Sequence, residues 1–401
     1  MPEPNADAGG ATPFARLVTC VALLWLAGVS LRLAMLAVPP LIRLIHDDLQ
    51  MSETEVGVLS GLPQVLFALA SVPGSLLIAR FGALPTLVTG LLGAAVASAL
   101  RGAAPNIWWL YAATVFTGFG IAVMQPALPS LVRAWLPDRI GFGTAVYANG
   151  LLVGEILPVA LMAPLVLPLV GGSWRLAFLA WAIPCVAIAL AIMAFAPRAA
   201  EAAPAAARKR WPDWRNGLIW KLGLMFGSVN AVYFAANAFI PDYLHHTGQA
   251  DFISGALSAL NIGQLPASLI LLVYADRLVG RVWPYLACGI LSIASLLGIL
   301  FGTAWLVVAA AGVLGFCGAA ILVFMLALPP LLSPPDDIHR TTAAMFTISY
   351  SCAVIVPVIS GLAWDASGVP AAAFVPMALC PLVLMALAPT IRAGSLSARR
   401  H

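Results

Sequence analysis

The sequence predicts an all-α membrane protein, with twelve transmembrane helices arranged in two pseudo-symmetric six-helix bundles. Three observations support this fold class. Only 9% of the 401 residues are charged and 62% are apolar, whereas about 25% of an ordinary soluble domain is charged. The apolar segments are long and unbroken, unlike the alternating strands of an outer-membrane barrel. The two halves of the chain also resemble each other at a nearly constant offset. A helical bundle that uses lipid as part of its solvent accounts for all three.

Twelve segments are apolar enough, at about 20 residues each, to cross a bilayer. We predict spans at 17–42, 54–79, 84–103, 107–134, 141–170, 175–196, 218–244, 252–275, 282–302, 304–332, 341–364 and 370–391. One long connection, rich in Ala and Pro, carries Arg208, Lys209, Arg210 and Arg215 and is typical of a linker. The expected parts are a cytoplasmic tail (1–16), an N-terminal bundle (17–196), a cytoplasmic linker (197–217), a C-terminal bundle (218–391) and a cytoplasmic tail (392–401).

The distribution of basic residues predicts the orientation in the membrane. If the N-terminus is cytoplasmic, only Arg43, Arg101 and Arg175 face outward, and Arg32 lies within the first span. All the other Lys and Arg residues, of 20 in the chain, then lie on the cytoplasmic side. Because positive charge collects on that side of bacterial membrane proteins, both termini are expected to face inward. These charges are spread over many loops, which argues against a nucleic-acid-binding face.

Short matches recur between the two halves. Gly57-Val58-Leu59-Ser60 is followed 198 residues later by Gly255-Ala256-Leu257-Ser258, and Pro137-Asp138 is followed at the same offset by Pro335-Asp336. The matches fall at equivalent points of the hydropathy pattern. A six-plus-six repeat with a basic central loop is typical of transporters whose two halves move around a central site.

A short turn after the second span of each half resembles the signature of the major facilitator superfamily. The second half contains Asp276-Arg277-Leu278-Val279-Gly280-Arg281; the first half keeps Arg80-Phe81-Gly82 but has Ala79 in place of the acid and Ala83 in place of the next base. The resemblance implies that this turn locks helices on the cytoplasmic side. The gate residues it assigns are Arg80, Gly82, Asp276, Arg277, Gly280 and Arg281.

Most of the chain resembles, within that superfamily, the cyanate and 2-nitroimidazole transporter subfamily. The residues that carry the resemblance are Leu31-Arg32, Val38-Pro39-Pro40, Leu62-Pro63, Ala79-Arg80-Phe81-Gly82, Leu100-Arg101-Gly102, Leu128-Pro129-Ser130-Leu131-Val132-Arg133, Pro137 and Tyr147. The resemblance implies transport of a small, compact solute that is anionic or polar and planar. It does not name that solute.

Two opposite charges lie within the predicted spans. Arg32 is placed near the middle of the first span, where a basic residue costs about 2.5–3.5 kcal/mol, so it should face the bundle interior. Its planar fork of donors suits a carboxylate-like anion. Glu155 is the only acid near the middle of any predicted span. In the superfamily the first and fifth helices are neighbours, which makes Glu155 a candidate partner of Arg32, a proton carrier or a competitor of substrate. A purely structural ion pair is the alternative for both residues.

Other polar side chains are placed on helical faces that should point inward, because an amide or phenol in lipid needs a hydrogen-bond partner. They are candidates for substrate contact, with helix–helix ties as the alternative. The set comprises Gln64, Gln125, Tyr147, Asn230, Tyr233, Asn237, Asn261, Gln264 and Tyr350. Arg101 and Arg133, at span ends, are interpreted as interfacial anchors whose charge reaches the membrane surface. For His245 and His246, near Asp242 and Asp251, a solvated loop is favoured over a metal site.

The leading hypothesis is a secondary active transporter that moves a small anion, such as cyanate, a short carboxylate or an inorganic anion, across the bacterial inner membrane by alternating access. Proton coupling is left open. The alternative is proton-driven efflux of small neutral or weakly basic aromatics such as nitroimidazoles. An enzyme is disfavoured because no cluster with catalytic or ligand spacing occurs. No cofactor or metal is expected; the expected partners are the solute, the lipid bilayer and, if coupled, protons, and the protein is expected to be a monomer.

Overall fold

The computed structural model describes residues 13–197 and 211–391, and these residues are almost entirely helical. The long helices of the first half are α1 (Pro13–Leu33), α3 (Glu53–Phe81), α4 (Ala83–Gly102), α5 (Ile107–Met124) with α6 (Ala127–Trp135), α7 (Ile140–Leu161) and α9 (Trp174–Phe195). Short elements join them: α2 (Ile42–Leu49) after a 3-10 turn (Pro39–Leu41), and α8 (Leu167–Leu169) after a π-helical turn (Met162–Val166).

The second half repeats the order with α10 (Gly217–His246), α11 (Ile253–Ile262) with α12 (Gln264–Leu278), α13 (Val282–Phe301), α14 (Trp305–Leu332), α15 (Ile338–Ser367) and α16 (Phe374–Leu387). In the described residues, twelve helical segments are long and apolar enough to cross a membrane. This confirms the predicted fold class. The predicted tails and most of the predicted linker, with Arg208, Lys209 and Arg210, lie outside the described residues.

The first predicted span is wrong at its outer end. The helix stops at Leu33, not at residue 42, and a turn leads into the short helix α2. Pro39 and Pro40 have no backbone N–H, so a helix that ran through them would leave carbonyls of its preceding turn without donors. Arg32 therefore occupies the last turn of α1 and is not in the middle of a helix.

Helix α3 begins at a capping box. In it, the Ser52 hydroxyl accepts a hydrogen bond from the Glu55 N–H, and the Glu55 carboxylate accepts one from the Ser52 N–H. The second of these bonds favours the charged carboxylate, so the pKa of Glu55 is lowered.

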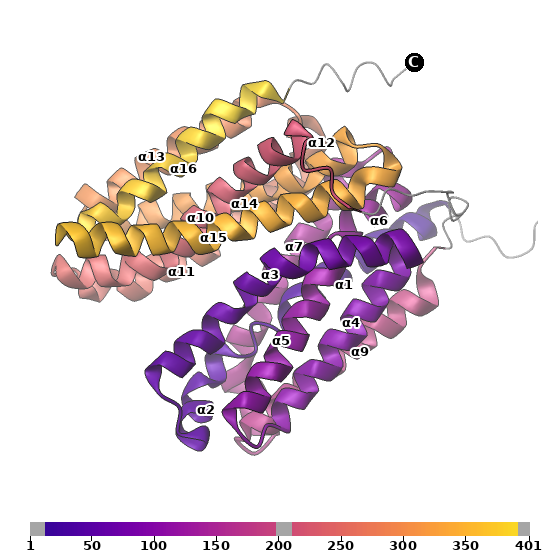
Figure 1. Cartoon of the computed structure of the whole chain (residues 1–401), viewed down its shortest axis with the longest axis horizontal. Coiled ribbons are helices and arrows are strands. Elements are labelled where there is room, and N and C mark those ends of the chain that lie inside the picture. The colour runs from indigo at the N-terminus through magenta and orange to yellow at the C-terminus, as the bar shows by residue number, and fades with distance from the viewer. Residues whose placement is uncertain (1–12, 198–210, 392–401) are drawn as a thin grey trace, which may run out of the picture.

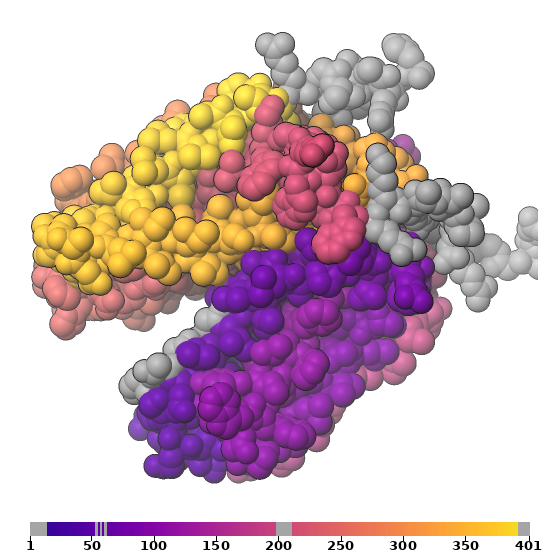
Figure 2. All heavy atoms as spheres, viewed as in Figure 1, coloured from indigo at the N-terminus to yellow at the C-terminus, as the bar shows by residue number. Residues whose placement is uncertain are grey.

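The two bundles touch at one end and part toward the other (Figure 1). We call the touching end, where α7 begins and α12 and α14 finish, the closed end. There Arg133 of α6 donates to the Pro330 carbonyl of α14. Halfway along, Thr347 of α15 donates to the Ala68 carbonyl of α3 at 2.9 Å, and Asn149 of α7 donates to Ser268 of α12 at 2.9 Å. A recess separates the halves beyond these contacts, as the space-filling view shows (Figure 2).

Within the first half, α1 and α7 pack backbone against backbone. A Cβ on Gly28 would lie 2.1 Å from the Tyr147 carbonyl oxygen, one on Gly150 would lie 2.2 Å from that of Trp25, and one on Gly154 would lie 2.2 Å from that of Val29. Only glycine permits so close an approach, and small residues at such interfaces are the usual basis of tight helix packing in membranes. The two helices therefore form one stiff unit.

Adding a single methyl group to this interface tests that conclusion. We expect Gly150→Ala to lower the free energy of unfolding by about 1–3 kcal/mol, because the backbones must separate to admit the methyl group. The measurement is the thermal unfolding midpoint of detergent-purified protein. Gly93→Ala is the matched control, since a Cβ at Gly93 has no heavy atom within 4 Å. An equal midpoint for the two variants would contradict the tight packing.

Candidate functional site

Two connected cavities lie between the halves. The outer cavity has a volume of about 630 Å³ and is lined by parts of α1, α3, α5, α7, α10, α11 and α12. The inner chamber has a volume of about 50 Å³ and is lined by α1, α6, α7, α10, α12, α14 and α15, with residues of both halves. Five residues line both spaces and so mark the boundary: Arg32, Leu152, Glu155, Tyr233 and Phe234. Every candidate substrate contact named from the sequence lines one of the two.

Arg32 and Glu155 face each other at this boundary. The Arg32 Nε lies 3.1 Å from Glu155 Oε1, and the two side chains are 15% and 20% exposed. The guanidinium also lies over the Phe67 ring, 5.6 Å from its centre. Among the described residues that line either cavity, these two are the only charged ones. Both residues belong to the first half and lie on the tightly packed helices α1 and α7, so the ion pair does not join the two halves.

Neutral polar groups of the second half face the outer cavity. The Tyr233 hydroxyl donates to Asn261 Oδ1 at 2.7 Å. Asn261 Nδ2 lies 3.3 Å from Asn237 Oδ1, and Asn237 donates to the Tyr233 carbonyl at 2.9 Å. These contacts hold the three side chains as one network on α10 and α11. Gln64 lines the outer cavity from α3.

The inner chamber has polar groups that lack protein partners. Tyr147 is 2% exposed and Gln125 is 3% exposed; the Tyr147 hydroxyl and Gln125 Oε1 have no hydrogen-bond partner in the described chain. The amide of Gln125 lies 3.5 Å from the Tyr350 hydroxyl, at the point where α5 gives way to α6. Asn230, which donates to Ser349 at 2.7 Å, and Gln264 also line the chamber. A buried polar atom without a partner loses free energy unless a ligand or water supplies the missing bond.

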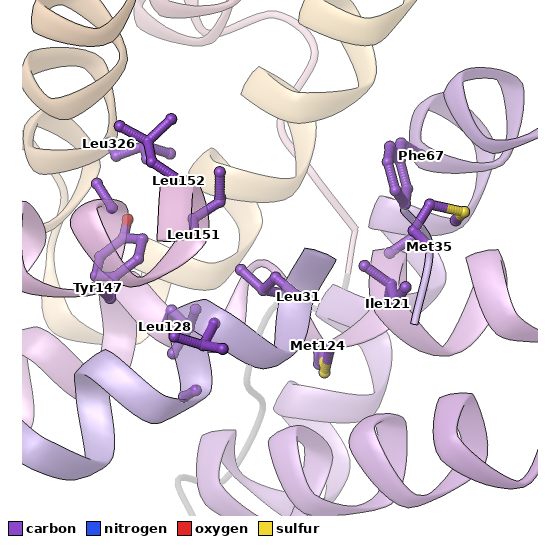
Figure 3. Close-up of a cluster of buried hydrophobic side chains, with 14 of the residues drawn as sticks. Leu31, Met35, Phe67, Ile121, Met124, Leu128, Tyr147, Leu151, Leu152 and Leu326 are labelled. Atoms are coloured by element: carbon purple, nitrogen blue, oxygen red, sulfur yellow. The ribbon is translucent and has the colours of Figure 1, made fainter. Parts of the chain in front are cut away.

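Apolar side chains enclose this polar spot. In Figure 3, the ring of Tyr147 lies among Leu151, Leu152 and Leu326, the last of which comes from the second half. The figure also shows Phe67 next to Met35. Four rings form a row beneath the Arg32 site, with centre-to-centre distances of 5.0 Å (Phe67–Tyr350), 6.0 Å (Tyr350–Phe346) and 5.7 Å (Phe346–Phe226). This row crosses from α3 to α15 and α10, and three of its rings, those of Tyr350, Phe346 and Phe226, line the inner chamber.

The phenylalanines of this row cannot be recognised from the sequence, because an aromatic residue in an apolar span does not differ in hydropathy from its neighbours. Thr114, whose buried hydroxyl has no partner and which lines the outer cavity, is likewise not predicted from the sequence.

The signature turn of the second half contacts the first half directly. Asp276 Oδ1 accepts a hydrogen bond from the Phe142 N–H at 2.9 Å, in the first turn of α7. A carboxylate at a helix N-terminus satisfies a free N–H and interacts favourably with the helix dipole. Gly141 makes room for it, because a Cβ there would lie 2.6 Å from Asp276 Oδ1.

The remaining gate residues are at the surface or in turns. Gly82 and Gly280 have φ angles of +91° and +81°, which favour glycine. Arg80 stacks on the neighbouring Phe81 ring, and Arg281 donates to the Arg277 carbonyl. Of the gate residues named from the sequence, all of which lie in the described ranges, Asp276 is the one that hydrogen-bonds across the two halves. The first half has Ala79 at the corresponding position.

One interpretation of a span-end residue is wrong. Arg101 does not reach the membrane surface: it is 0% exposed, because its guanidinium turns inward onto the end of α1. Arg133 is held by the Pro330 carbonyl at the contact between the halves. His246 lies against the carbonyl of Asp242, and no group of three or more His, Cys, Asp or Glu residues in the described ranges could hold a metal ion.

Comparison with known proteins identifies the family. Residues 24–260, more than half of the chain, match the model of the Major Facilitator Superfamily. The chain belongs to this superfamily. Two solved members share its fold: the human organic anion transporter MFSD10 (TM-score 0.74, 15% identity, covering 94% of this chain and 100% of that one) and the transporter FucP in its outward conformation (TM-score 0.71, 15% identity, covering 93% and 98%).

Three bacterial relatives also match. They are the uncharacterized transporter YycB of Bacillus subtilis strain 168 (27% identical over 252 residues, 62% of this chain), the 2-nitroimidazole transporter of Escherichia coli strain K12 (27% over 247 residues, 61%) and the cyanate transport protein CynX of the same organism (26% over 358 residues, 86%). The aligned region spans 61% and 62% of the first two relatives and 90% of CynX. These matches confirm the resemblance to the cyanate and 2-nitroimidazole transporters. The protein is a multi-pass membrane protein of the bacterial inner membrane.

The cap that Asp276 places on α7 gives a test of the contact between the halves. We expect Asp276→Ala to weaken the contact at the closed end by about 1 kcal/mol, the usual value of a helix cap. The population of conformations in which the halves separate there should then rise about fivefold. The measurement is the rate at which a thiol reagent modifies a cysteine placed at Phe142, a half-buried residue in the first turn of α7; this substitution keeps the backbone N–H that donates to Asp276. Asp276→Asn should fall between wild type and Asp276→Ala, and Asp365→Ala, at an exposed position on α15, should have no effect. A cysteine that reacts equally fast in all four backgrounds would rule out the cap as a lock.

Proposed function

We propose that this protein is a secondary active transporter for a small, compact anion, which binds between the halves at Arg32. The single observation that supports this most strongly is the placement of Arg32 at the junction of the two cavities. It is the only cation that faces either space among the residues the structure describes. A guanidinium with a planar fork of donors is well suited to a carboxylate-like or triatomic anion.

The size of the inner chamber supports a small ligand. A water molecule needs about 10–15 Å³ of such volume, so the chamber of about 50 Å³ holds a ligand of roughly three or four non-hydrogen atoms. Cyanate, nitrite and formate fall in this range. The unpartnered Tyr147 hydroxyl and the amide of Gln125 would then complete the hydrogen bonds of an anion bound to Arg32. The wider outer cavity serves as the entrance.

Glu155 competes with the anion for Arg32. A ligand anion can take the guanidinium only if Glu155 moves aside or becomes neutral by binding a proton. Because both charges ride on the stiff pair α1 and α7, a relative motion of the two halves does not pull them apart. Ligand and proton together are the simplest means of opening the pair, and this makes the anion and the proton co-substrates.

The membrane potential favours the same coupling. Importing a monovalent anion into a cell whose interior is negative costs about 2.3 kcal/mol per 100 mV. A proton that travels with the anion removes this cost, since the pair is electroneutral. Export of the anion alone would run downhill and would need no proton.

The sidedness follows from charge. Arg80, Arg133, Arg139, Arg277 and Arg340 all lie near the closed end, at the ends of the spans that meet there. By the preference of basic residues for the cytoplasm, we assign the closed end to the cytoplasmic side, both termini to the cytoplasm, and the structure to an outward-facing state. Alternating access then requires the contacts of Arg133, Asp276 and the aromatic row to open. We retain 17–196 and 218–391 as the two moving units, joined by a cytoplasmic linker.

One observation favours the second hypothesis, efflux of small aromatics. The outer cavity, at about 630 Å³, is lined by Phe67, Phe234 and several aliphatic side chains and would hold an azole ring. In that case the aromatic substrate would bind in the outer cavity, and Glu155 would bind and release the exchanged proton while Arg32 made no contact with the substrate.

A ligand screen separates the two functions. With wild-type protein in detergent, we expect cyanate, nitrite or formate at a hundred times its dissociation constant to raise the free energy of unfolding by about 2.7 kcal/mol. Arg32→Ala should abolish this stabilisation because the anion loses its cation. Arg43→Ala, at an exposed position of α2, is the control. The double variant Arg32→Gln/Glu155→Gln removes the anion site without leaving Glu155 as a lone charge. Stabilisation by azoles alone, or an anion effect that survives both Arg32 variants, would transfer support to the efflux hypothesis.

The pH dependence of binding tests the role of Glu155. We expect the anion affinity of the wild type to fall up to tenfold per pH unit over the range in which Glu155 loses its proton, because an ionised Glu155 holds Arg32. In Glu155→Gln the affinity should be high and almost independent of pH. Titration calorimetry at several pH values measures both. Parallel pH profiles for the two proteins would mean that Glu155 does not compete for Arg32.

A further inference from the structure

Arg101, in the last turn of α4, is a buried cation that neither the proposed transport site nor the gate uses. It is 0% exposed, and no salt bridge to it occurs in the described chain. Its Nη2 donates to the Ala34 carbonyl at 2.5 Å and to the Ser98 hydroxyl at 3.1 Å, and its guanidinium lies 4.9 Å from the centre of the Phe178 ring. Its Nε and Nη1 have no hydrogen-bond partner. An ionisable residue kept in a membrane-embedded bundle at such a cost points to a role beyond packing.

The acceptor of Arg101 identifies that role. Ala34 is two residues beyond Arg32, in the turn where α1 breaks. The Arg32 carbonyl accepts hydrogen bonds from the Met35 N–H at 3.1 Å and the Leu36 N–H at 2.9 Å, so residues 32–36 form one closed turn. Arg101 of α4 holds that turn by its hydrogen bond to the Ala34 carbonyl. It also places a positive charge at the carbonyl end of α1, where a cation interacts favourably with the helix dipole.

This turn forms part of the transport site. Met35, Leu36 and Val38 line the outer cavity beside Arg32. Residues 34–38 lie between the end of α1 at Leu33 and the 3-10 turn that begins at Pro39, so this segment has no continuous helix on both sides and depends on contacts outside its own backbone for its position.

We propose that Arg101 is a positioning residue that anchors the broken end of α1 and thereby sets the direction in which Arg32 enters the cavity. The idea rests on the proposed anion site at Arg32, which it deepens. Arg101 does not touch the ligand. Its effect on transport passes through the Ala34 carbonyl and the turn that contains Arg32.

Arg175 provides a matched control in the same bundle. Like Arg101, it donates to a backbone carbonyl, that of Ala104 at 2.5 Å, and it stacks on an aromatic ring, that of Trp174 at 4.4 Å. It pairs with Asp48 at 2.7 Å, and within the described chain its side-chain hydrogen bonds go to Ala104 and Asp48 and not to the turn at 32–36. If the substitutions act through a general loss of bundle stability, the variants of both residues should lose anion affinity. If they act through the position of Arg32, only the Arg101 variants should lose it.

The first measurement is the dissociation constant of the anion that stabilises the wild type. We expect Arg101→Met to raise it roughly three- to thirtyfold, the range found for residues that act on a site without touching the ligand. Arg101→Gln, which keeps a donor for Ala34, should give a smaller rise, and Arg175→Met should leave the constant unchanged. Wild-type affinity in Arg101→Met, or equal losses in Arg101→Met and Arg175→Met, would overturn the proposal.

The second measurement needs neither ligand nor purified protein. Leu36→Cys, introduced together with Cys352→Ser, is labelled in membranes by a charged thiol reagent. If Arg101 anchors the turn, labelling should become several times faster in Arg101→Met, and also in Arg101→Gln to a smaller extent, but not in Arg175→Met. Equal rates in all backgrounds would overturn the proposal even if Arg101→Met were too unstable to purify. If no anion binds the wild type, the proposed function fails, and the labelling rates still decide the role of Arg101.

Discussion

The proposed transport site depends on one physical constraint: the guanidinium of Arg32 must remain charged and accessible inside an apolar bundle. Its nearest compensation is Glu155, at 3.1 Å, and the face of Phe67 adds a weaker attraction. The pair can be held in place because Gly28, Gly150 and Gly154 let α1 and α7 touch along their backbones. The break in α1 directly after Arg32 then brings the head group to the junction of the two cavities.

The two halves share a fold but differ in chemistry. The first half contributes the charges, and the second contributes a network of neutral donors and acceptors around Asn261 together with most of the aromatic row. At the closed end the asymmetry is reversed, since the second half supplies Asp276 to α7 and the first half has Ala79. Each half therefore holds one polar element that the other lacks: the first half holds the Arg32–Glu155 pair of the proposed site, and the second half holds the carboxylate that caps α7.

Much of this organisation follows from the sequence. Charge scarcity and span length predict the twelve helices. The resemblance to the superfamily, in which the first and fifth helices are neighbours, makes Glu155 a candidate partner of Arg32. The end of α1 was missed because hydropathy continues through Val38, whereas the effect of Pro39 and Pro40 is local. Arg101 was misplaced for a different reason: a charge at the end of a span ordinarily reaches the interface, and only the packing of α4 against α1 shows that it turns inward. The aromatic row and the unpartnered hydroxyl of Thr114 are products of tertiary packing, which spacing along the chain does not encode.

The central claim is that an anion and a proton open the Arg32–Glu155 pair together. The most direct measurement is the number of protons taken up when the anion binds, followed with a pH-indicating dye in weakly buffered detergent solution at a pH where Glu155 is ionised. We expect about one proton per anion bound in the wild type, and none in Glu155→Gln although the anion still binds. Anion binding to the wild type without proton uptake would contradict the account.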